Sequence, residues 1–457
     1  MMIDCTKCGM SYDPKEYESC PYCGAEREKE TAIVAEAVKS EEKAELVEKP
    51  AKQKEKTLKV SIPAGEKSGG SLKYILIGVA AVAIIAAVAF GFSAFGGSGA
   101  TVPDKYATIQ EAIDAAQDGD EIIVQMGVYR ENIDYKGKNI IIRSIDPDDP
   151  AVVSSTIIDG DGQSSVVSFR SGEGEGAVLS GFTVIRGVGG ILISGGSTPL
   201  IEKCSIEDNS AEFGAGLFIV DSNPVIRDNQ IIANRADSGG GVFIEKSTPI
   251  LEGNNIARNE ARMGAGLFIV DSSPVIRDNQ IIANRAARLG GGFIITGDST
   301  PVINNNTIGG NFAGLNGGGF YIQESKPVIE DNTIIGNQAE NGGGIIVVFI
   351  LDPGLRLTGN TFESNLAYRA GGALYLVGSS PTFESNSFKD NTSEFLGGAV
   401  AVYDSAPIFI RNNFEKNSAN NAGRGGAMWI SNDSNLEISD PDDNIYLGNN
   451  PDDIFRE

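Results

Sequence analysis

Apolar residues recur along most of the chain in segments of about 25 residues. Most segments open with a glycine pair, continue with a short apolar stretch, turn at Ser-x-Pro and close with two asparagines five residues apart. The segments begin at Gly189, Gly214, Gly239, Gly264, Gly290, Gly317, Gly342, Gly371, Gly397 and Gly425. A period of this length is typical of a solenoid, in which neighbouring repeats bury a shared core.

Within one repeat, the apolar positions predict three short strands. Leu217 and Ile219 stand two residues apart in the first stretch, Ile226 marks the second and Ile231 the third. The later repeats carry apolar residues at the same points. Because alternate residues of a strand point to the same face, these positions are expected to line a core. The sequence therefore predicts an all-β parallel β-helix, triangular in cross-section, with about 13 stacked coils.

The asparagines form two columns, represented by Asn229 and Asn234. Asparagine tolerates left-handed backbone at a sharp corner, and its amide can bond to the same amide one coil along. We expect structural ladders, because every coil shares them, whereas a binding comb for a ligand is the alternative. Cys204 takes the place of the first asparagine in the repeat from Gly189, and is expected to be a small buried residue.

Between the two inward positions of the first strand lies an outward position that is often aromatic. Its aromatic members are Phe218, Phe243, Phe268, Tyr321, Tyr375 and Trp429. A solvated sheet face is normally polar, so this row predicts a binding face that stacks on a glycan or contacts a partner protein. The alternative is that the rings stabilise the sheet by cross-strand packing, or that a neighbouring segment covers them.

A short amphipathic helix precedes the repeats. Thr108 and Glu111 form a capping box, and Ile109, Ala112, Ile113 and Ala116 line one helical face. Gly119-Asp120, the turn Gly127-Val128-Tyr129-Arg130-Glu131-Asn132 and Gly137-Lys138 follow.

In these motifs, residues 102–457 resemble the right-handed parallel β-helix proteins of the pectate-lyase-like superfamily. The resemblance implies the same fold, with the helix covering the open end of the solenoid. Pectin methylesterases of this fold use two aspartates with an arginine and a glutamine, lyases use calcium carboxylates with a basic residue, and polygalacturonase-type sites contain a histidine. The sequence shows no such non-repeating cluster and has no histidine. The repeat from Gly342 breaks the pattern and carries Asp352 and Arg356, which by themselves do not make a site.

Residues 74–95, YILIGVAAVAIIAAVAFGFSAF, contain no charge and are long enough to cross ~30 Å of hydrocarbon as a helix. Residues 49–73 hold seven lysines and two glutamates, whereas residues 96–120 hold one lysine and five acidic residues. The positive-inside rule therefore predicts a cytoplasmic N-terminus and an extracytoplasmic solenoid. The formal net charge of −24 makes a nucleic-acid partner unexpected.

Four cysteines crowd into the first 23 residues as two C-x-x-C-G knuckles. This arrangement resembles a zinc ribbon, in which Cys5, Cys8, Cys20 and Cys23 hold one structural Zn²⁺. Two disulfides or a redox pair are the alternative. A thiolate site implies a reducing compartment, in agreement with the predicted topology.

The sequence thus predicts a zinc ribbon over residues 1–28, a charged flexible linker over 29–73, a transmembrane helix over 74–95 and a right-handed parallel β-helix over 96–457. The predicted function is that of a membrane-anchored, cell-surface protein that binds a glycan, an envelope polymer or a protein partner without catalysis. The alternative is a polysaccharide-active enzyme (lyase, esterase or hydrolase) on the same fold.

Overall fold

The computed structural model describes residues 3–4, 11–12, 100–350, 354–420, 423–435, 437–438 and 444–457. The chain divides into two units, Met1–Ser61 and Ile62–Glu457. In the first unit, β1 (Ile3–Asp4) and β2 (Ser11–Tyr12) pair antiparallel. The four predicted zinc cysteines, the linker and the predicted span all lie outside the described residues. Within the described ranges, no helix has the length and apolar character needed to span a bilayer.

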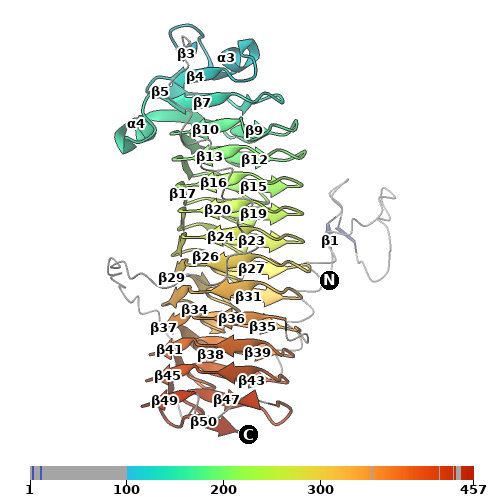
Figure 1. The fold of residues 1–457 in the computed structure, drawn as a ribbon, viewed down its shortest axis with the longest axis vertical. Helices are drawn as coiled ribbons and strands as arrows, with labels where there is room; N and C mark the ends of the chain where they lie inside the picture. The colour runs from blue at the N-terminus through green and yellow to red at the C-terminus, as the bar shows by residue number, and fades with distance from the viewer. Residues whose placement is uncertain are drawn as a thin grey trace. The chain divides into compact units, whose positions relative to one another are not determined.

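From Ala100 onward the second unit winds as a parallel β-helix (Figure 1). Except at the two ends of each sheet, every strand pairs in parallel with the equivalent strand of the coil before it and the coil after it. For example, Phe218 is in register with Leu192 on one side and with Phe243 on the other. The predicted solenoid is thereby confirmed, because strands that doubled back as hairpins would pair antiparallel.

Three long sheets run along the solenoid. Sheet 1 contains β3 (Ala100–Val102), β4 (Glu121–Val124), β7 (Ile141–Ser144), β10 (Val178–Ser180), β13 (Leu200–Glu202), β16 (Val225–Arg227), β20 (Ile250–Glu252), β24 (Val275–Arg277), β28 (Val302–Asn304), β32 (Val328–Glu330), β36 (Arg356–Thr358), β40 (Thr382–Glu384), β44 (Ile408–Ile410) and β48 (Glu437–Ile438). Sheet 2 contains β5 (Gly127–Tyr129), β8 (Thr156–Asp159), β11 (Thr183–Ile185), β14 (Ser205–Glu207), β17 (Gln230–Ile232), β21 (Asn255–Ala257), β25 (Gln280–Ile282), β29 (Thr307–Gly309), β33 (Thr333–Ile335), β37 (Thr361–Glu363), β41 (Ser387–Lys389), β45 (Asn413–Glu415) and β49 (Ile445–Leu447). Sheet 3 contains β6 (Ile133–Asp134), β9 (Val167–Phe169), β12 (Ile191–Ile193), β15 (Leu217–Val220), β19 (Val242–Glu245), β23 (Leu267–Val270), β27 (Phe293–Thr296), β31 (Phe320–Gln323), β35 (Ile345–Val348), β39 (Leu374–Val377), β43 (Val400–Tyr403), β47 (Met428–Ile430) and β50 (Ile454–Arg456).

A fourth, shorter sheet was not predicted. Sheet 4 contains β18 (Arg235–Ser238), β22 (Glu260–Met263), β26 (Arg285–Leu289), β30 (Phe312–Ala313), β34 (Gln338–Asn341), β38 (Leu366–Ala370), β42 (Thr392–Ser393) and β46 (Ser418–Ala419). The three-sided cross-section is therefore correct only for the first coils. The segment between the second asparagine and the glycines contains too few large apolar residues to signal a strand, because its buried position is an alanine in most coils. Five alanines of this region, Ala261, Ala265, Ala286, Ala313 and Ala339, form a small core cluster of their own.

The predicted inward columns form the core. Leu217, Ile219, Ile226 and Ile231 are completely buried, as are their equivalents through most of the solenoid. Toward the C-terminus the aliphatic side chains of one column give way to a stack of rings. Phe362, Phe388, Phe414 and Tyr446 lie in successive coils with centroids 4.7 to 5.1 Å apart. This distance matches the spacing of paired strands, so each ring packs on its equivalent in the next coil.

The two asparagine columns form the predicted ladders. The side-chain Oδ1 of Asn254 accepts hydrogen bonds from both the backbone N and the Nδ2 of Asn229, at 3.0 and 3.1 Å. Asn234 and Asn259 repeat this geometry at the second corner. These buried amides satisfy corner N–H groups that no strand can reach, which is a structural role. Cys204 ends the first ladder, with its backbone N donating to Asn229 Oδ1 at 3.0 Å.

The third corner carries an additional ladder, of serines. The backbone N of Ser222 donates to Ser247 Oγ at 3.0 Å, and Ser247 N donates to Ser272 Oγ at 3.0 Å. The serine of the Ser-x-Pro turn therefore does at this corner what asparagine does at the other two. Ile350 takes this place in the irregular repeat from Gly342, and its backbone N donates to Ser379 Oγ at 3.1 Å.

The predicted N-terminal cap is present as α3 (Ile109–Ala115). Thr108 is its N-cap and accepts a hydrogen bond from the backbone N of Glu111. The Glu131 carboxylate accepts from the backbone N–H groups of Ile109 and Gln110 at 3.0 and 2.9 Å. At the other end, Lys138 Nζ donates to the last helical carbonyls. The Gly127–Asn132 and Gly137–Lys138 motifs thus hold the cap by both ends.

A second helix, α4 (Pro150–Ser155), was not predicted. Asp149 is its N-cap and Pro150 occupies its first turn. It replaces the simple corner between sheet 1 and sheet 2 in one coil, between β7 and β8. Figure 1 shows it projecting from one side of the solenoid.

Candidate functional site

The predicted aromatic binding face lies on the outer side of sheet 3, where Phe218, Phe243 and Phe268 stand in register. The rings of Phe243 and Phe268 stack with centroids 5.1 Å apart. However, Phe243 and Phe268 are each only 7% exposed, Tyr321 is 3% exposed and Trp429 is 5% exposed. Phe218 and Tyr375 are half-buried. The row of rings exists as predicted, but most of it is not open to a ligand.

In several repeats the cover comes from the residue that precedes the glycines. Phe213 packs the edge of its ring on Phe243 at 5.3 Å, and Met263 and Leu289 are 3% and 1% exposed in the same column. Farther along, Ala370 and Leu396 pack against Trp429 and Tyr375.

Gly264 explains how the chain doubles back so closely over the rings. It has φ +60°, and a Cβ there would lie 3.1 Å from the Cβ and Cδ2 of Phe268. Only glycine meets both conditions at this point. The expectation of an open aromatic face is therefore corrected. The residues that precede the glycines form a second layer over sheet 3, and most of the rings are buried beneath it.

The outer side of sheet 2 is open, and over five consecutive coils its outward residues carry no charge. We call this surface the neutral strip. Its members are Gln230, Ile232, Asn255, Ala257, Gln280, Ile282, Thr307, Gly309, Thr333 and Ile335. One column is amide or hydroxyl and the other is aliphatic or glycine. Beyond the strip, charged residues return, at Glu207 on one side and at Glu363 on the other.

The polar column of the neutral strip presents hydrogen-bonding groups at the strand spacing of ~4.8 Å. Gln230 and Gln280 are exposed, and Asn255, Thr307 and Thr333 are partly exposed. Asn255 Nδ2 donates to Gln230 Oε1 at 2.7 Å, so the amides of neighbouring coils are held side by side. In the parallel column Ile232 and Ile282 are partly exposed, and Ala257 is buried between them.

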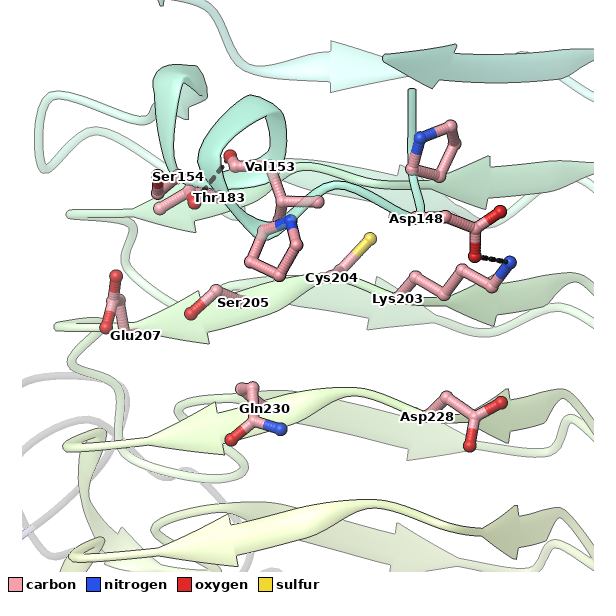
Figure 2. A pocket seen from close by; sticks show the side chains of 12 residues that line it. Asp148, Val153, Ser154, Thr183, Lys203, Cys204, Ser205, Glu207, Asp228 and Gln230 are labelled. Carbon is pink, nitrogen blue, oxygen red and sulfur yellow. Dashed lines mark hydrogen bonds and ion pairs between the residues drawn. The ribbon is translucent and has the colours of Figure 1, made fainter. Parts of the chain in front are cut away.

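At its N-terminal end the neutral strip meets a pocket of about 420 Å³ under α4. Pro150, Val153 and Ser154 of the helix form one wall, and Thr183, Ser205, Glu207 and Gln230 come from sheet 2 (Figure 2). The Thr183 Oγ1 donates to the Val153 carbonyl at 2.9 Å, which ties the helix to the sheet. The unpredicted helix therefore builds this pocket by standing above a face that is otherwise flat.

The ionisable groups of the pocket lie at its two ends. Lys203 Nζ donates to Asp148 Oδ1 at 2.6 Å, and this hydrogen bond raises the pKa of Lys203. Glu207 lies at the other end, with Ser205 and Gln230 between, while Asp228 is near Lys203 (Figure 2). Burial raises the pKa of Glu207, with a further contribution from the neighbouring Asp208 carboxylate.

Cys204 belongs to the pocket wall but offers no nucleophile. The residue is 1% exposed, and burial raises the pKa of its thiol to about 12. Its Sγ lies 3.2 Å from the Glu202 carbonyl. A thiol in this environment stays protonated at neutral pH, so the expectation of a buried structural residue is confirmed.

Other predicted positions make no site in the part of the chain that the structure describes. Arg356 of the irregular repeat forms a surface ion pair with Glu384 at 2.6 Å, and Asp352 lies outside the described residues. No group of three or more histidines, cysteines, aspartates and glutamates among the described residues is placed to hold a metal ion. The sequence does contain a signal for the neutral strip, because its members are the two residues that flank the third apolar position of each repeat.

Comparisons with known proteins agree with the fold. A family model described as a right-handed beta helix region matches residues 141–316, 251–371 and 309–442. No curated protein matches the chain. Among solved structures, the chain is similar to the catalytic unit of a thermostable GH87 α-1,3-glucanase from Streptomyces thermodiastaticus strain HF3-3, with 14% identity and a TM-score of 0.41 over 78% of this chain and 69% of that chain. A likeness of this strength carries no argument about activity. The family matches overlap to cover most of the solenoid, and the chain belongs to the right-handed β-helix family.

Proposed function

We propose that the β-helix binds an uncharged polysaccharide along the neutral strip, with one end of the bound chain entering the pocket under α4. The observation that carries the proposal is the absence of charge from ten consecutive outward positions of sheet 2. The chain as a whole has 98 charged side chains and a net charge of −24. A solvated face of such a protein would otherwise be expected to carry charges.

The two columns of the strip suit the two kinds of surface that a sugar ring offers. Amide and hydroxyl groups such as Gln280 and Thr307 can exchange hydrogen bonds with sugar hydroxyls. Ile282 and Ile335 can pack against the C–H face of the ring. The repeat along the solenoid, ~4.8 Å per coil, is close to the advance per sugar of an extended polysaccharide. An acidic polymer would instead be repelled by the net negative charge.

Binding is favoured over hydrolysis by the layout of the pocket. Glycoside hydrolysis normally needs two carboxyl groups that flank one bond, about 5 to 9.5 Å apart. Glu207 and Asp228 lie at opposite ends of the pocket with Ser205 and Gln230 between them (Figure 2). The raised pKa of Glu207 fits a general acid, but no second carboxylate in the pocket faces it.

Retention of the full-length chain on immobilised neutral glucan, mannan and xylan, compared with polygalacturonate, tests the proposal. The variant Thr307→Asp places a charge in the middle of the strip and should weaken retention on the neutral polymer by at least tenfold. Thr358→Asp adds the same charge on the outer face of sheet 1 and should leave retention unchanged. Equal loss in both variants, or preferential binding of polygalacturonate, would contradict the proposal. Release of reducing ends that stops in Glu207→Gln would favour the enzymatic alternative.

We also propose the N-terminal arrangement that the sequence predicts: a structural zinc ion on Cys5, Cys8, Cys20 and Cys23, a membrane span over residues 74–95 and a cytoplasmic N-terminus. The spacing of the two C-x-x-C-G motifs supports the zinc site, because two such knuckles supply four thiolates to one tetrahedral ion. Metal analysis should find about one zinc ion per chain, and the double variant Cys5→Ser/Cys8→Ser should lose it. External protease should reach the β-helix but not the ribbon in intact cells; the reverse result would contradict the topology.

A further inference from the structure

The outer face of sheet 1 carries two columns that run side by side along the solenoid. The first is aliphatic over eight consecutive strands, from Ile141 of β7 to Val328 of β32. Figure 1 shows the first six of these strands, β7, β10, β13, β16, β20 and β24, one below another. These side chains are half-buried, and Val328 is 37% exposed. A row of this length on an outward face is an apolar patch of the kind that marks an interaction surface.

The second column carries charges of alternating sign. Its charged members, in order along the solenoid, are Arg143, Glu202, Arg227, Glu252, Arg277 and Glu330. Ser180 lies after the first of them and Asn304 before the last. Three arginines and three glutamates cancel, so this face is neutral in a chain whose net charge is −24. It is thus a surface on which two copies of the chain can meet without strong repulsion.

Both columns have the same centre, between β16 and β20. A two-fold axis placed there, parallel to the strands, brings a second copy face to face with the first. The solenoid axes of the two copies then run in opposite directions. Aliphatic residues then meet aliphatic residues, with Val225 opposite Ile250 at the centre and Ile141 opposite Val328 at the ends.

In the charged column the same operation sets every residue opposite a complementary one. Arg227 faces Glu252, Glu202 faces Arg277, Ser180 faces Asn304 and Arg143 faces Glu330. One coil beyond the aliphatic stripe, the match continues in the first column. Glu121 occupies that column at one end and Arg356 at the other, and the operation brings these two together.

Other placements of the second copy set unlike or repelling residues opposite one another. A shift of one coil in one direction sets Glu202 opposite Glu252, and a shift in the other direction sets Arg227 opposite Arg277. A two-fold axis along the solenoid would lay aliphatic residues on the charged column. Like charges placed directly opposite cost free energy. Within one copy Arg227 pairs with Glu202 at 2.5 Å and Arg277 pairs with Glu252 at 3.0 Å, so aliphatic residues laid on this column would remove water from these ion pairs without adding a partner. Among these arrangements, only the antiparallel one centred between β16 and β20 sets aliphatic residues opposite aliphatic residues and each charge opposite its counterion.

We propose that this face of sheet 1 binds a second copy of the same chain, in an antiparallel homodimer. Such an interface is isologous, since each contact between two different residues occurs twice, once on each side of the axis. Ten coils at ~4.8 Å and strands of three residues give a footprint of roughly 45 by 10 Å on each copy. This is near the lower limit for specific protein interfaces, so the dimer dissociates at low concentration. The proposal does not depend on polysaccharide binding, because it uses sheet 1 and not sheet 2.

Sedimentation of the full-length chain in mild detergent, over a range of concentrations, tests the dimer. Arg227→Glu sets two glutamates opposite one another at the centre and should raise the dissociation constant at least tenfold. Glu252→Arg should do the same with two arginines. The double variant Arg227→Glu/Glu252→Arg restores opposite charges across the axis and should recover the dimer. Thermal unfolding of each variant shows that the solenoid is intact.

Disulfide formation tests the direction of the second copy. Ile141 and Val328 are seven coils apart in one chain, roughly 34 Å, so thiols at both positions cannot bond within it. The double variant Ile141→Cys/Val328→Cys should give a covalent dimer in which peptide mapping joins position 141 to position 328. A chain that stays monomeric, a dimer that ignores the charge reversals, or links only between two copies of position 141 would overturn the proposal.

Discussion

The outer faces of sheets 2 and 3 are produced by the same strand alternation, yet one is open and the other is covered. On sheet 3 many of the outward residues are aromatic, and in several coils the segment before the glycine pair packs over them. On sheet 2 the outward residues of the neutral strip are amides, hydroxyls, aliphatics and a glycine, and all of them except Ala257 and Gly309 remain at least partly exposed. The comparison teaches that residue type alone did not reveal the accessible face. Aromatic rings marked the place where a second layer docks.

The largest effect is expected from truncating a covered ring. Phe268→Ser removes a side chain that packs on Phe243 and is 7% exposed, and should lower the free energy of unfolding by about 3 kcal/mol. Ile335→Ser on the open face of sheet 2 should cost about 1 kcal/mol or less. Urea unfolding of the two variants measures the contrast. Equal losses would show that the two faces do not differ as the structure indicates.

A smaller effect is expected from placing a larger side chain in the alanine cluster of sheet 4. Ala286 is completely buried in the alanine cluster, and Ala286→Leu should destabilise the fold by about 2 kcal/mol because the added carbons have no space. Ala287→Leu, one residue along and exposed in the same strand, is the matched control and should be nearly neutral. If the two variants unfold at the same urea concentration, sheet 4 does not close over the solenoid as described.

A pH-dependent effect is expected at the end of the neutral strip. Burial raises the pKa of Glu207 in the folded chain; Asp208 raises it further, while Ser205 and Arg258 act in the opposite direction. The folded state therefore binds this proton more tightly than the unfolded state does. The contribution of protonated Glu207 to the stability of the folded state is present at low pH, and it is lost as the pH rises through the pKa of the folded state. Glu207→Gln should raise the melting temperature slightly at pH 7 and not near pH 4. A constant difference across this range would place Glu207 in solvent.

The smallest effect is expected at Cys204, and it concerns the reactivity of the thiol. With a thiol pKa of about 12, only about one thiol in 10⁴ is ionised at pH 8. Iodoacetamide should leave Cys204 unmodified in the native chain and label it after denaturation, as read by peptide mass spectrometry. Rapid labelling of the native chain would show that the corner under α4 opens.

Particular residues show how much the sequence could predict. Ile226 and Ile231 were assignable to the core because every coil repeats them. Asn229 and Asn234 were assignable to ladders because a repeated polar residue at a corner must find its partner in the next coil. The cap was also predictable, since Thr108 and Glu111 interact within one helical turn. Each of these features depends on contacts that the repeat itself defines.

Other features had no local signal. Ala286 does not distinguish a strand of sheet 4 from a turn, because alanine has little preference for strands. The burial of Phe268 depends on a glycine turn that brings the preceding segment back over its ring. The pocket depends on α4, a short insertion held over sheet 2 by the hydrogen bond from Thr183 to Val153 and, just before the helix, by that from Lys203 to Asp148. The zinc cysteines and the predicted span lie outside the described residues and remain predictions.

The sequence by itself determined the coil: which side chains face inward, which amides line the corners and how often the pattern returns. These follow from strand alternation and from a fixed repeat, which are properties of neighbouring residues along the chain. Only the tertiary structure decided which outward faces remain open. That outcome depends on what packs over a strand from outside, and alternation carries no information about the second layer.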